Sequence, residues 1–278
     1  MRKIIFSLLI ITIFIGLILV GCKKKSSSEP VPIAATNTPT PIVWNTTKNI
    51  DDMETIASDG SAGPDNANNI PVTEGGPGYW YTYDDILDVL KPPDGNLNTS
   101  NASYVWPMSR NRWTVILNQP TPEPTFIMSS PGYGNTGYCA RITGYVTTAF
   151  KYGFVGMGVN FLMVNADNSK KPVDISNMTG IRFYAKGDGK NYRIKLPSQF
   201  SGFLKKEGDN HYGREFVAPT SWTQIHFLLT QFTQEPYWGT SVNLNDALKE
   251  IDSIQFQTVG QPHASIDLSV DNLEIYKQ

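Results

Sequence analysis

The chain has 278 residues and a net charge of −2 at pH 7, with 23 Lys and Arg against 25 Asp and Glu. This balance excludes the basic surface with which nucleic-acid-binding proteins hold phosphates, so we expect no nucleic-acid partner. The chain has only 2 cysteines, which excludes a disulfide-rich scaffold and leaves a buried core to hold the fold.

Residues 1–21 have the pattern of a secretory signal peptide. A short basic start precedes a largely apolar run over residues 4–20, and this run is short for a membrane-spanning helix, which needs about 20 apolar residues. Leu-Val-Gly-Cys at residues 19–22 resembles the lipobox of bacterial lipoproteins, which implies cleavage before Cys22 and lipid on that cysteine. An Asp directly after the lipidated cysteine would mark retention in the inner membrane, but this chain has Lys23 there. We therefore expect a membrane-anchored lipoprotein at the outer membrane or cell surface. An uncleaved signal anchor is the alternative.

Residues 22–47 are predicted to form an extended linker. The segment is rich in Ser, Thr and Pro, a composition that cannot bury a core and favours extended backbone. The linker would hold the globular part, residues 48–278, away from the bilayer. The length of that part suits one large domain.

Apolar and polar residues alternate in several short runs beyond residue 48. Alternation with a period of two is typical of strands that bury one face. Two short helices are predicted, over residues 84–90 and 243–250. Many short strands with few helices between them predict an all-β fold, a β-sandwich of the jelly-roll type. The alternating runs are residues 138–143, 181–186, 192–196, 225–229, 254–257 and 266–270.

Six short motifs follow one another along this domain. They are Ile-Asp-Asp-Met-Glu at residues 50–54, Tyr-Trp-Tyr-Thr-Tyr-Asp-Asp at 79–85, Tyr-Cys-Ala-Arg-Ile-Thr-Gly at 138–144, Gly-Met-Gly-Val-Asn-Phe at 156–161, Gly-Ile-Arg-Phe-Tyr-Ala-Lys-Gly-Asp-Gly at 180–189 and Ile-Asp-Leu-Ser-Val-Asp-Asn-Leu at 266–273. In this order they resemble the jelly-roll domains of family 11 carbohydrate-binding modules and the related complex I intermediate-associated protein family. The resemblance implies a galactose-binding-like β-sandwich and a polysaccharide ligand such as a β-glucan.

The alternation changes phase at two places, around residues 51–52 and around residues 271–272. A change of phase indicates a bulge, which re-aims a side chain. In the resembling modules the first and last strands share a structural calcium, a cation that takes six to eight oxygen ligands. The resemblance implies Asp52, Glu54 and Asp271 as its ligands. The alternative is that these are solvated acids that discourage pairing at a sheet edge.

The chain has 13 Tyr and 6 Trp, more than a core requires. Aromatic rings cover the apolar faces of sugars, while polar side chains fix their hydroxyl groups. We therefore predict a ligand-binding face lined by residues on outward phases and loops. For each of them, packing within the domain is the alternative. The candidates are Tyr81, Tyr83, Tyr184, Arg193, Lys195, His211, Tyr212, Trp238 and Gln257.

Enzyme motifs are missing from the sequence. The 3 His lack metal-binding spacing, there is no Gly-x-Ser-x-Gly or phosphate-binding glycine loop, and Cys139 lies in a strand pattern without a paired base. We expect no organic cofactor and a non-catalytic, surface-anchored carbohydrate-binding lipoprotein. A structural or protein-binding lipoprotein of the cell envelope is the first alternative. A glycan-active enzyme, with two carboxylates roughly 5–10 Å apart in a cleft, is the second.

Overall fold

The computed structural model describes residues 41–55, 66–71, 77–90, 99–117, 125–164, 169–203 and 210–278. The predicted signal peptide, Cys22 and most of the linker lie outside the described residues. No helix within the described ranges is long and apolar enough to cross a membrane. These ranges belong to one compact unit, residues 39–278.

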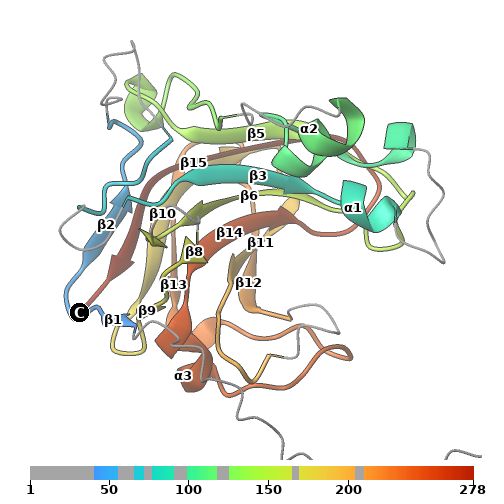
Figure 1. The fold of residues 1–278 in the computed structure, drawn as a ribbon. Coiled ribbons are helices and arrows are strands. Elements are labelled where there is room, and N and C mark those ends of the chain that lie inside the picture. Colours follow the sequence, from blue (N-terminus) through green and yellow to red (C-terminus); the bar gives the residue numbers. More distant parts are fainter. Residues whose placement is uncertain are drawn as a thin grey trace, which may run out of the picture. The chain divides into compact units, whose positions relative to one another are not determined.

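Five antiparallel strands form the first of two stacked sheets (Figure 1). We refer to it as the five-stranded sheet. In β11 and β14 the apolar residues face the core and alternate with polar residues, as the sequence predicts. Its strands, in spatial order, are β12 (Tyr212–Val217), β11 (Asn191–Leu196), β14 (Ser253–Thr258), β6 (Val155–Asn160) and β3 (Trp80–Asp84).

The second sheet is built around one long strand, β15 (His263–Tyr276). β5 pairs with its first half and β2 with its end, and the pairing is interrupted between them at Asp271–Asn272, where Asn272 has a φ of +50°. This irregularity matches the predicted change of phase. The sheet, called the six-stranded sheet, comprises β13 (Thr223–Leu228), β10 (Gly180–Gly187), β15, β5 (Ala140–Val146) and β4 (Tyr104–Trp106), with β2 (Lys48–Asp51) also on β15.

Smaller elements close the ends of the sandwich. Figure 1 shows α1 and α2 together at one end and α3 away from them. A buried ion pair between Arg112 of α2 and Asp84 of β3 (2.9 Å) holds α2 against the five-stranded sheet. The elements are β1 (Ile42–Val43) paired with β9 (Val173–Asp174), β7 (Met163–Val164) paired with β8 (Ser169–Lys170), helices α1 (Ile86–Val89), α2 (Arg110–Leu117) and α3 (Leu244–Ala247), and 3₁₀ turns η2 (Thr99–Asn101), η3 (Tyr133–Asn135), η5 (Leu229–Gln231) and η6 (Leu248–Glu250).

The folded part begins before residue 48, where the sequence predicts the linker to end. β1 pairs with β9, and Trp44 is only 2% exposed and packs on Phe161 with ring centroids 5.3 Å apart. Trp44 therefore belongs to the core and Ile42 packs against it, so residues 42–44 belong to the folded part although Val43 is exposed.

The core lies between the two sheets and is rich in aromatic side chains. Phe183 of the six-stranded sheet meets Phe256 and Phe216 of the five-stranded sheet, with centroids 5.1 and 5.5 Å apart. Burying one such ring contributes about 1.5–3 kcal/mol to folding. Cys139 is buried as predicted, and burial raises its thiol pKa to about 11. The fold is thus the predicted all-β sandwich, whose outer faces are available for function.

Candidate functional site

The outer face of the five-stranded sheet brings outward side chains from all five strands into two rows. The strand register sets both rows, because directly paired residues in neighbouring strands point to the same side of a sheet. The first row is Glu215, Arg193, Gln257, Gly156 and Tyr83, and the second is Gly213, Lys195, Gln255, Gly158 and Tyr81.

Two glycines of β6 make room for two tyrosine rings. A Cβ at Gly156 would lie 2.5 Å from the Tyr83 hydroxyl oxygen, and a Cβ at Gly158 would lie 2.8 Å from the Tyr81 hydroxyl oxygen. Each tyrosine side chain therefore extends across β6 instead of standing away from the sheet. The two ring centroids are 6.1 Å apart, and both side chains are half-buried. Together the rings form an aromatic platform on this face.

Amide side chains of β14 connect the platform to the cationic side chains of β11. Gln255 Nε2 donates to the Tyr81 hydroxyl (2.9 Å), and the Tyr83 hydroxyl donates to Gln257 Oε1 (3.4 Å). Lys195 Nζ donates to the same Gln257 oxygen (3.3 Å). Burial holds the pKa of Tyr83 well above its ordinary value, so this hydroxyl stays protonated and remains a donor.

Arg193 lies between two acidic side chains at the β12 end of this face. Its residue is only 6% exposed, its Nη1 lies 3.9 Å from Glu215 and its Nε lies 3.6 Å from Glu235. Its Nη2 donates to the carbonyl of Thr233. Gly213 leaves space for the guanidinium, since a Cβ there would lie 2.5 Å from Arg193 Nε. Among the described residues, that buried Nε has no hydrogen-bond partner.

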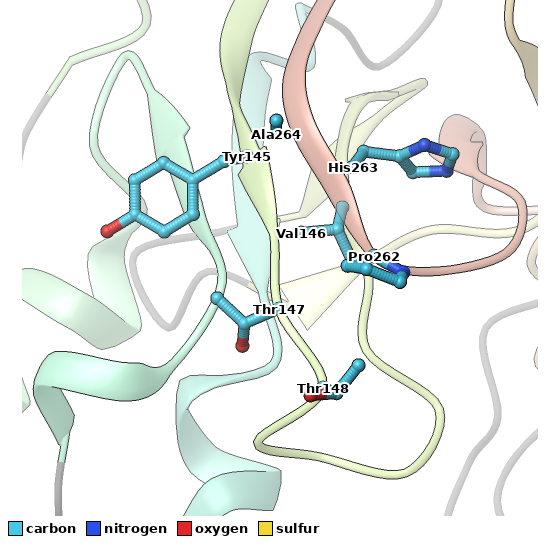
Figure 2. A pocket seen from close by; sticks show the side chains of 7 residues that line it. All are labelled: Tyr145, Val146, Thr147, Thr148, Pro262, His263 and Ala264. Atoms are coloured by element: carbon cyan, nitrogen blue, oxygen red, sulfur yellow. The ribbon is translucent and has the colours of Figure 1, made fainter.

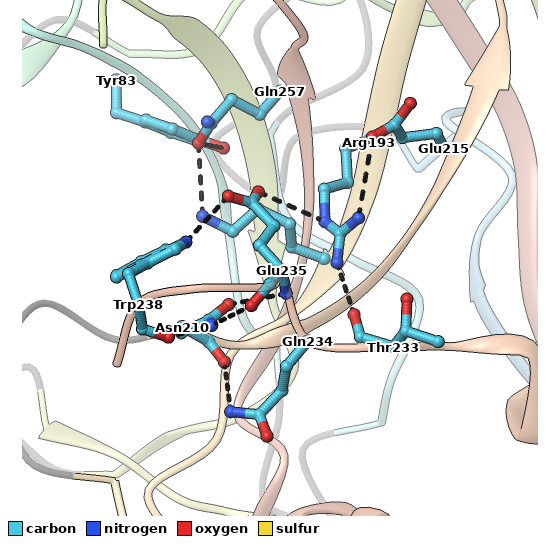
Figure 3. Close-up of polar contacts among 10 residues, drawn as sticks. Tyr83, Arg193, Asn210, Glu215, Thr233, Gln234, Glu235, Trp238 and Gln257 are labelled. Carbon is cyan, nitrogen blue, oxygen red and sulfur yellow. Dashed lines mark hydrogen bonds and ion pairs between the residues drawn. The ribbon is translucent and has the colours of Figure 1, made fainter. Parts of the chain in front are cut away.

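A loop over residues 233–239 borders the site beside Arg193 (Figure 3). The Asn210 amide donates to the carbonyls of Glu235 and Trp238 (both 2.7 Å) and accepts from the Glu235 N–H (3.0 Å). Trp238 Nε1 donates to the Glu235 carboxylate (3.0 Å), and the Trp238 residue is 42% exposed. Tyr237 is fully exposed and has a φ of +72°. The loop is thus fixed by side-chain bonds and presents two aromatic side chains.

The structure brings six of the nine predicted ligand residues together. Tyr81, Tyr83, Arg193, Lys195 and Gln257 share the outer face, and Trp238 borders it through Glu235. The sequence analysis missed Glu235, Asn210 and Tyr237, because a loop has no periodicity that could place them. The Pro-Tyr-Trp-Gly turn at residues 236–239 was their only signal.

Three predicted ligand residues have other roles, so the nine candidates do not share one face. His211 Nδ1 accepts from the Ser198 N–H (3.4 Å); burial, then the charges of Lys195 and Lys170, lowers its pKa to about 3. Tyr212 pairs with core-facing Leu196, packs against the core and donates its hydroxyl to the Val242 carbonyl. Tyr184 lies on the six-stranded sheet. These contacts agree with packing within the domain, and a ligand contact of the three residues stays a prediction.

The carboxylates of this part of the chain are mostly held in ion pairs and hydrogen bonds. Glu215 and Glu235 both face Arg193, and their side chains are about half exposed. Asp84 pairs with Arg112, and Asp85 accepts from the Ser103 N–H (2.9 Å). A glycosidase needs one carboxylic acid kept protonated to act as proton donor and a second carboxylate facing it across the substrate. Burial raises the pKa of Asp85, whereas Asp84, Glu215 and Glu235 each face an arginine.

The three predicted calcium ligands surround the loop over residues 132–138. Asp271 accepts from the Tyr133 N–H (2.6 Å), Glu54 accepts from the Tyr138 N–H (2.8 Å) and Asp52 accepts from the Glu54 N–H (3.1 Å). Burial, together with the charges of Glu54 and Asp52, raises the pKa of Asp271 to about 6. Oxygen donors suit calcium. Across the described ranges no three His, Cys, Asp or Glu side chains converge as metal ligands, so a cation here would also need backbone carbonyls.

A pocket of about 410 Å³ lies elsewhere, where β5 ends and β15 begins, between residues 145–148 and 262–264. In Figure 2 the rings of Tyr145 and His263 point away from each other on opposite sides of these strands. None of the predicted ligand residues lines this pocket. Its side chains do not converge on one point, in contrast to the rows on the five-stranded sheet.

The strand order and the aromatic core define the class of the protein, an antiparallel β-sandwich of the jelly-roll type. The family model of Complex I intermediate-associated protein 30 (CIA30) matches residues 128–270, just over half of the chain, and the chain belongs to this family. The predicted resemblance is thereby confirmed. No curated protein matches the chain.

Several solved structures are similar. The family 11 carbohydrate-binding module of the cellulosomal cellulase Lic26A-Cel5E of Clostridium thermocellum is 16% identical, with a TM-score of 0.47 over 84% of this chain and 95% of the module. The same organism's module in complex with a β-1,3-1,4-mixed-linked tetrasaccharide gives 16% identity and a TM-score of 0.46, over 84% and 97%. A family 30 carbohydrate-binding module gives 11% and 0.41, over 57% and 86%.

Proposed function

We propose that the protein is a non-catalytic carbohydrate-binding protein that holds a polysaccharide, such as a β-glucan, along the outer face of the five-stranded sheet. The observation that carries this proposal is the aromatic platform of Tyr81 and Tyr83 beside a row of amide and charged side chains. Flat rings suit the C–H faces of sugars, and amide, guanidinium and carboxylate groups suit their hydroxyls.

The dimensions of the face favour a chain of sugars over a single sugar. Neighbouring strands lie about 4.8 Å apart, so the distance from β12 to β3 across the five strands is roughly 19 Å. A chain lying along the rows would meet the platform at one end and Arg193, Glu235 and Trp238 at the other. The fixed loop keeps Trp238 in place, which reduces the entropy lost on binding.

The experiment is retention of residues 39–278 on a panel of insoluble and soluble polysaccharides. We expect retention on one glycan class and its loss in the Tyr81→Ala/Tyr83→Ala double variant. Tyr145→Ala is the matched control, because Tyr145 is an exposed tyrosine of the other sheet. A folded domain that no glycan retains would contradict the proposal and favour the alternative of a protein partner in the cell envelope.

We also propose that lipid on Cys22 anchors the protein at the outer membrane or cell surface, with the Ser/Thr/Pro-rich linker between lipid and domain. Two or more acyl chains are enough for stable anchoring. A Cys22→Ser variant should move from the membrane fraction to the soluble fraction and should lose incorporation of a labelled fatty acid. Membrane retention of the variant without label would contradict lipid anchoring.

A structural calcium held by Asp52, Glu54, Asp271 and carbonyls of the nearby loop is the third part of the proposal. What supports it is the buried Asp271 carboxyl with two acids beside it, a cluster of negative charge that a cation would neutralise. The cation would link Asp52 and Glu54, near the start of the domain, to Asp271 in the second half of β15. Its role would be stability, and its test is given in the Discussion.

A further inference from the structure

A second pocket, of about 180 Å³, lies on the outer face of the six-stranded sheet. Side chains of β5 and β15 form its floor, Trp222 forms one wall and residues 129–131 form another. We propose that this pocket is a second carbohydrate site, which takes one sugar unit. It lies on the opposite sheet from the polysaccharide face and shares no residue with it.

The floor of the pocket carries a bidentate ion pair. Arg141 Nε and Nη2 donate to the two carboxylate oxygens of Asp267, at 2.9 and 2.7 Å. The side chains are 44% and 40% exposed, so N–H groups and lone pairs of the pair still face the pocket. Ser269, from the same strand as Asp267, adds a hydroxyl. The pair is pre-organised, because each partner fixes the orientation of the other.

The aromatic wall is supported from behind. Trp222 packs edge-on against Tyr133, with centroids 6.3 Å apart and an interplanar angle of 83°. Tyr133 in turn stacks on Tyr184, with centroids 3.6 Å apart. Tyr184, which does not reach the polysaccharide face, therefore acts here as a support for the wall. A held indole ring loses little conformational freedom when a ligand binds.

The chemistry of the pocket favours a polyhydroxylated ring. Arg141 and Asp267 neutralise each other, and the exposed Lys186 of β10, which also lines the pocket, adds N–H donors and a positive charge. The remaining donors and acceptors, side by side, suit hydroxyl groups, which both donate and accept. The pocket is smaller than the roughly 300–1,000 Å³ of sites for drug-sized ligands. It therefore suits one sugar unit, either a free sugar or the end or a branch of a glycan.

The test follows the indole N–H signal of Trp222 by two-dimensional NMR of the full chain. The chain has 6 Trp, and the signal that disappears in Trp222→Phe is assigned to Trp222. The wild type is titrated with the methyl glycosides of glucose, galactose, mannose and xylose, and with oligosaccharides that end in the same sugars. We expect at least one glycoside to move this signal to saturation. Asp267→Asn should weaken that binding by about tenfold or more.

Two control variants show whether the response arises in this pocket. Glu274→Gln breaks a similar ion pair on the same sheet, with Arg182, and should leave the titration unchanged. Tyr81→Ala/Tyr83→Ala removes the aromatic platform and should also leave it unchanged, so the two sites can fail separately. If the oligosaccharides also shift the Trp222 signal to saturation, the ligand of the pocket is the end of a glycan. If only the methyl glycosides do so, the ligand is a free sugar. A Trp222 signal that no probe moves, or a response that persists in Asp267→Asn, would overturn the proposal.

Discussion

The Tyr83 side chain crosses β6 directly over Gly156, where a Cβ on the glycine would lie 2.5 Å from the tyrosine hydroxyl oxygen. The position of the ring therefore depends on the absence of a side chain at Gly156. The same relation holds between Tyr81 and Gly158, at 2.8 Å. The aromatic platform is thus encoded by two strands, one that supplies rings and one that leaves room for them.

Gly156→Ala should displace the Tyr83 ring. Inserting a methyl group into a packed contact costs about 1–3 kcal/mol, so we expect a lower unfolding free energy and about tenfold weaker glycan binding. Urea denaturation and calorimetric titration measure the two effects. In a Tyr83→Ala background the same substitution should cost less, because the clash with the ring is gone and only that with the Phe256 carbonyl oxygen, 2.7 Å from the added Cβ, remains. An equal cost in both backgrounds would show that the glycine is required for another reason.

Asn210→Ala should loosen the loop that carries Trp238. Three hydrogen bonds to the loop are lost, each contributing about 0.5–1.5 kcal/mol. We expect several-fold weaker glycan binding together with faster backbone amide exchange at residues 234–239. Thr223→Ala, which removes one exposed side-chain hydrogen bond outside the site, is the control. If amide exchange in the loop becomes faster but the glycan affinity does not change, the loop does not contribute to glycan binding.

Calcium should stabilise the domain. A ligand that binds only the folded state at about 100 times its Kd adds roughly 2.7 kcal/mol, which corresponds to a rise in Tm of about 5–10 °C for a domain of this size. Scanning calorimetry with calcium and with chelator should show this rise in the wild type and in Asp246→Asn, an exposed acid elsewhere. Asp271→Asn should abolish it. An equal Tm with calcium and with chelator would contradict the calcium proposal.

His211 should make the domain less stable in acid. Its pKa is about 3 in the folded protein, against 6.5 for an unperturbed histidine. As the pH falls, the unfolded chain takes up the proton first, so the stability from the neutral ring is complete above pH 6.5 and is lost as the pH falls toward 3.

The matched variant is His211→Asn, whose side-chain oxygen can still accept from the Ser198 N–H but does not titrate. Urea unfolding across this pH range should show a shallower loss of stability in the variant than in the wild type. Parallel pH profiles would mean that His211 takes up its proton as readily in the folded domain as in the unfolded chain.

Strand alternation predicts much of the fold and of the site. The phases of Tyr81, Tyr83, Arg193 and Lys195 place them outward, and the structure has them on one face, because each lies in a strand whose other side meets the core. The motif order also predicts the jelly roll. Strand alternation is a local pattern, and the order of the motifs is a property of the chain. Both can therefore be recognised without knowledge of tertiary contacts.

Other features depend on contacts between distant segments. Alternation cannot say which sheet a strand joins, so Tyr184 and Tyr81 look equivalent in the sequence although they lie on different sheets. Tyr212 sits in an edge strand whose inward phase is not evident from its neighbours. Ile42 and Val43 form a two-residue strand, too short for periodicity to register.

The central claim is that a glycan lies on the aromatic platform of the five-stranded sheet. The most direct measurement is the Kd of the retained polysaccharide, by calorimetric titration, for the wild type, Tyr83→Ala and Tyr145→Ala. Losing a buried aromatic contact costs more than about 1 kcal/mol at a binding hot spot, so Tyr83→Ala should bind about tenfold more weakly while Tyr145→Ala binds like the wild type. Equal Kd values for all three proteins would contradict the claim.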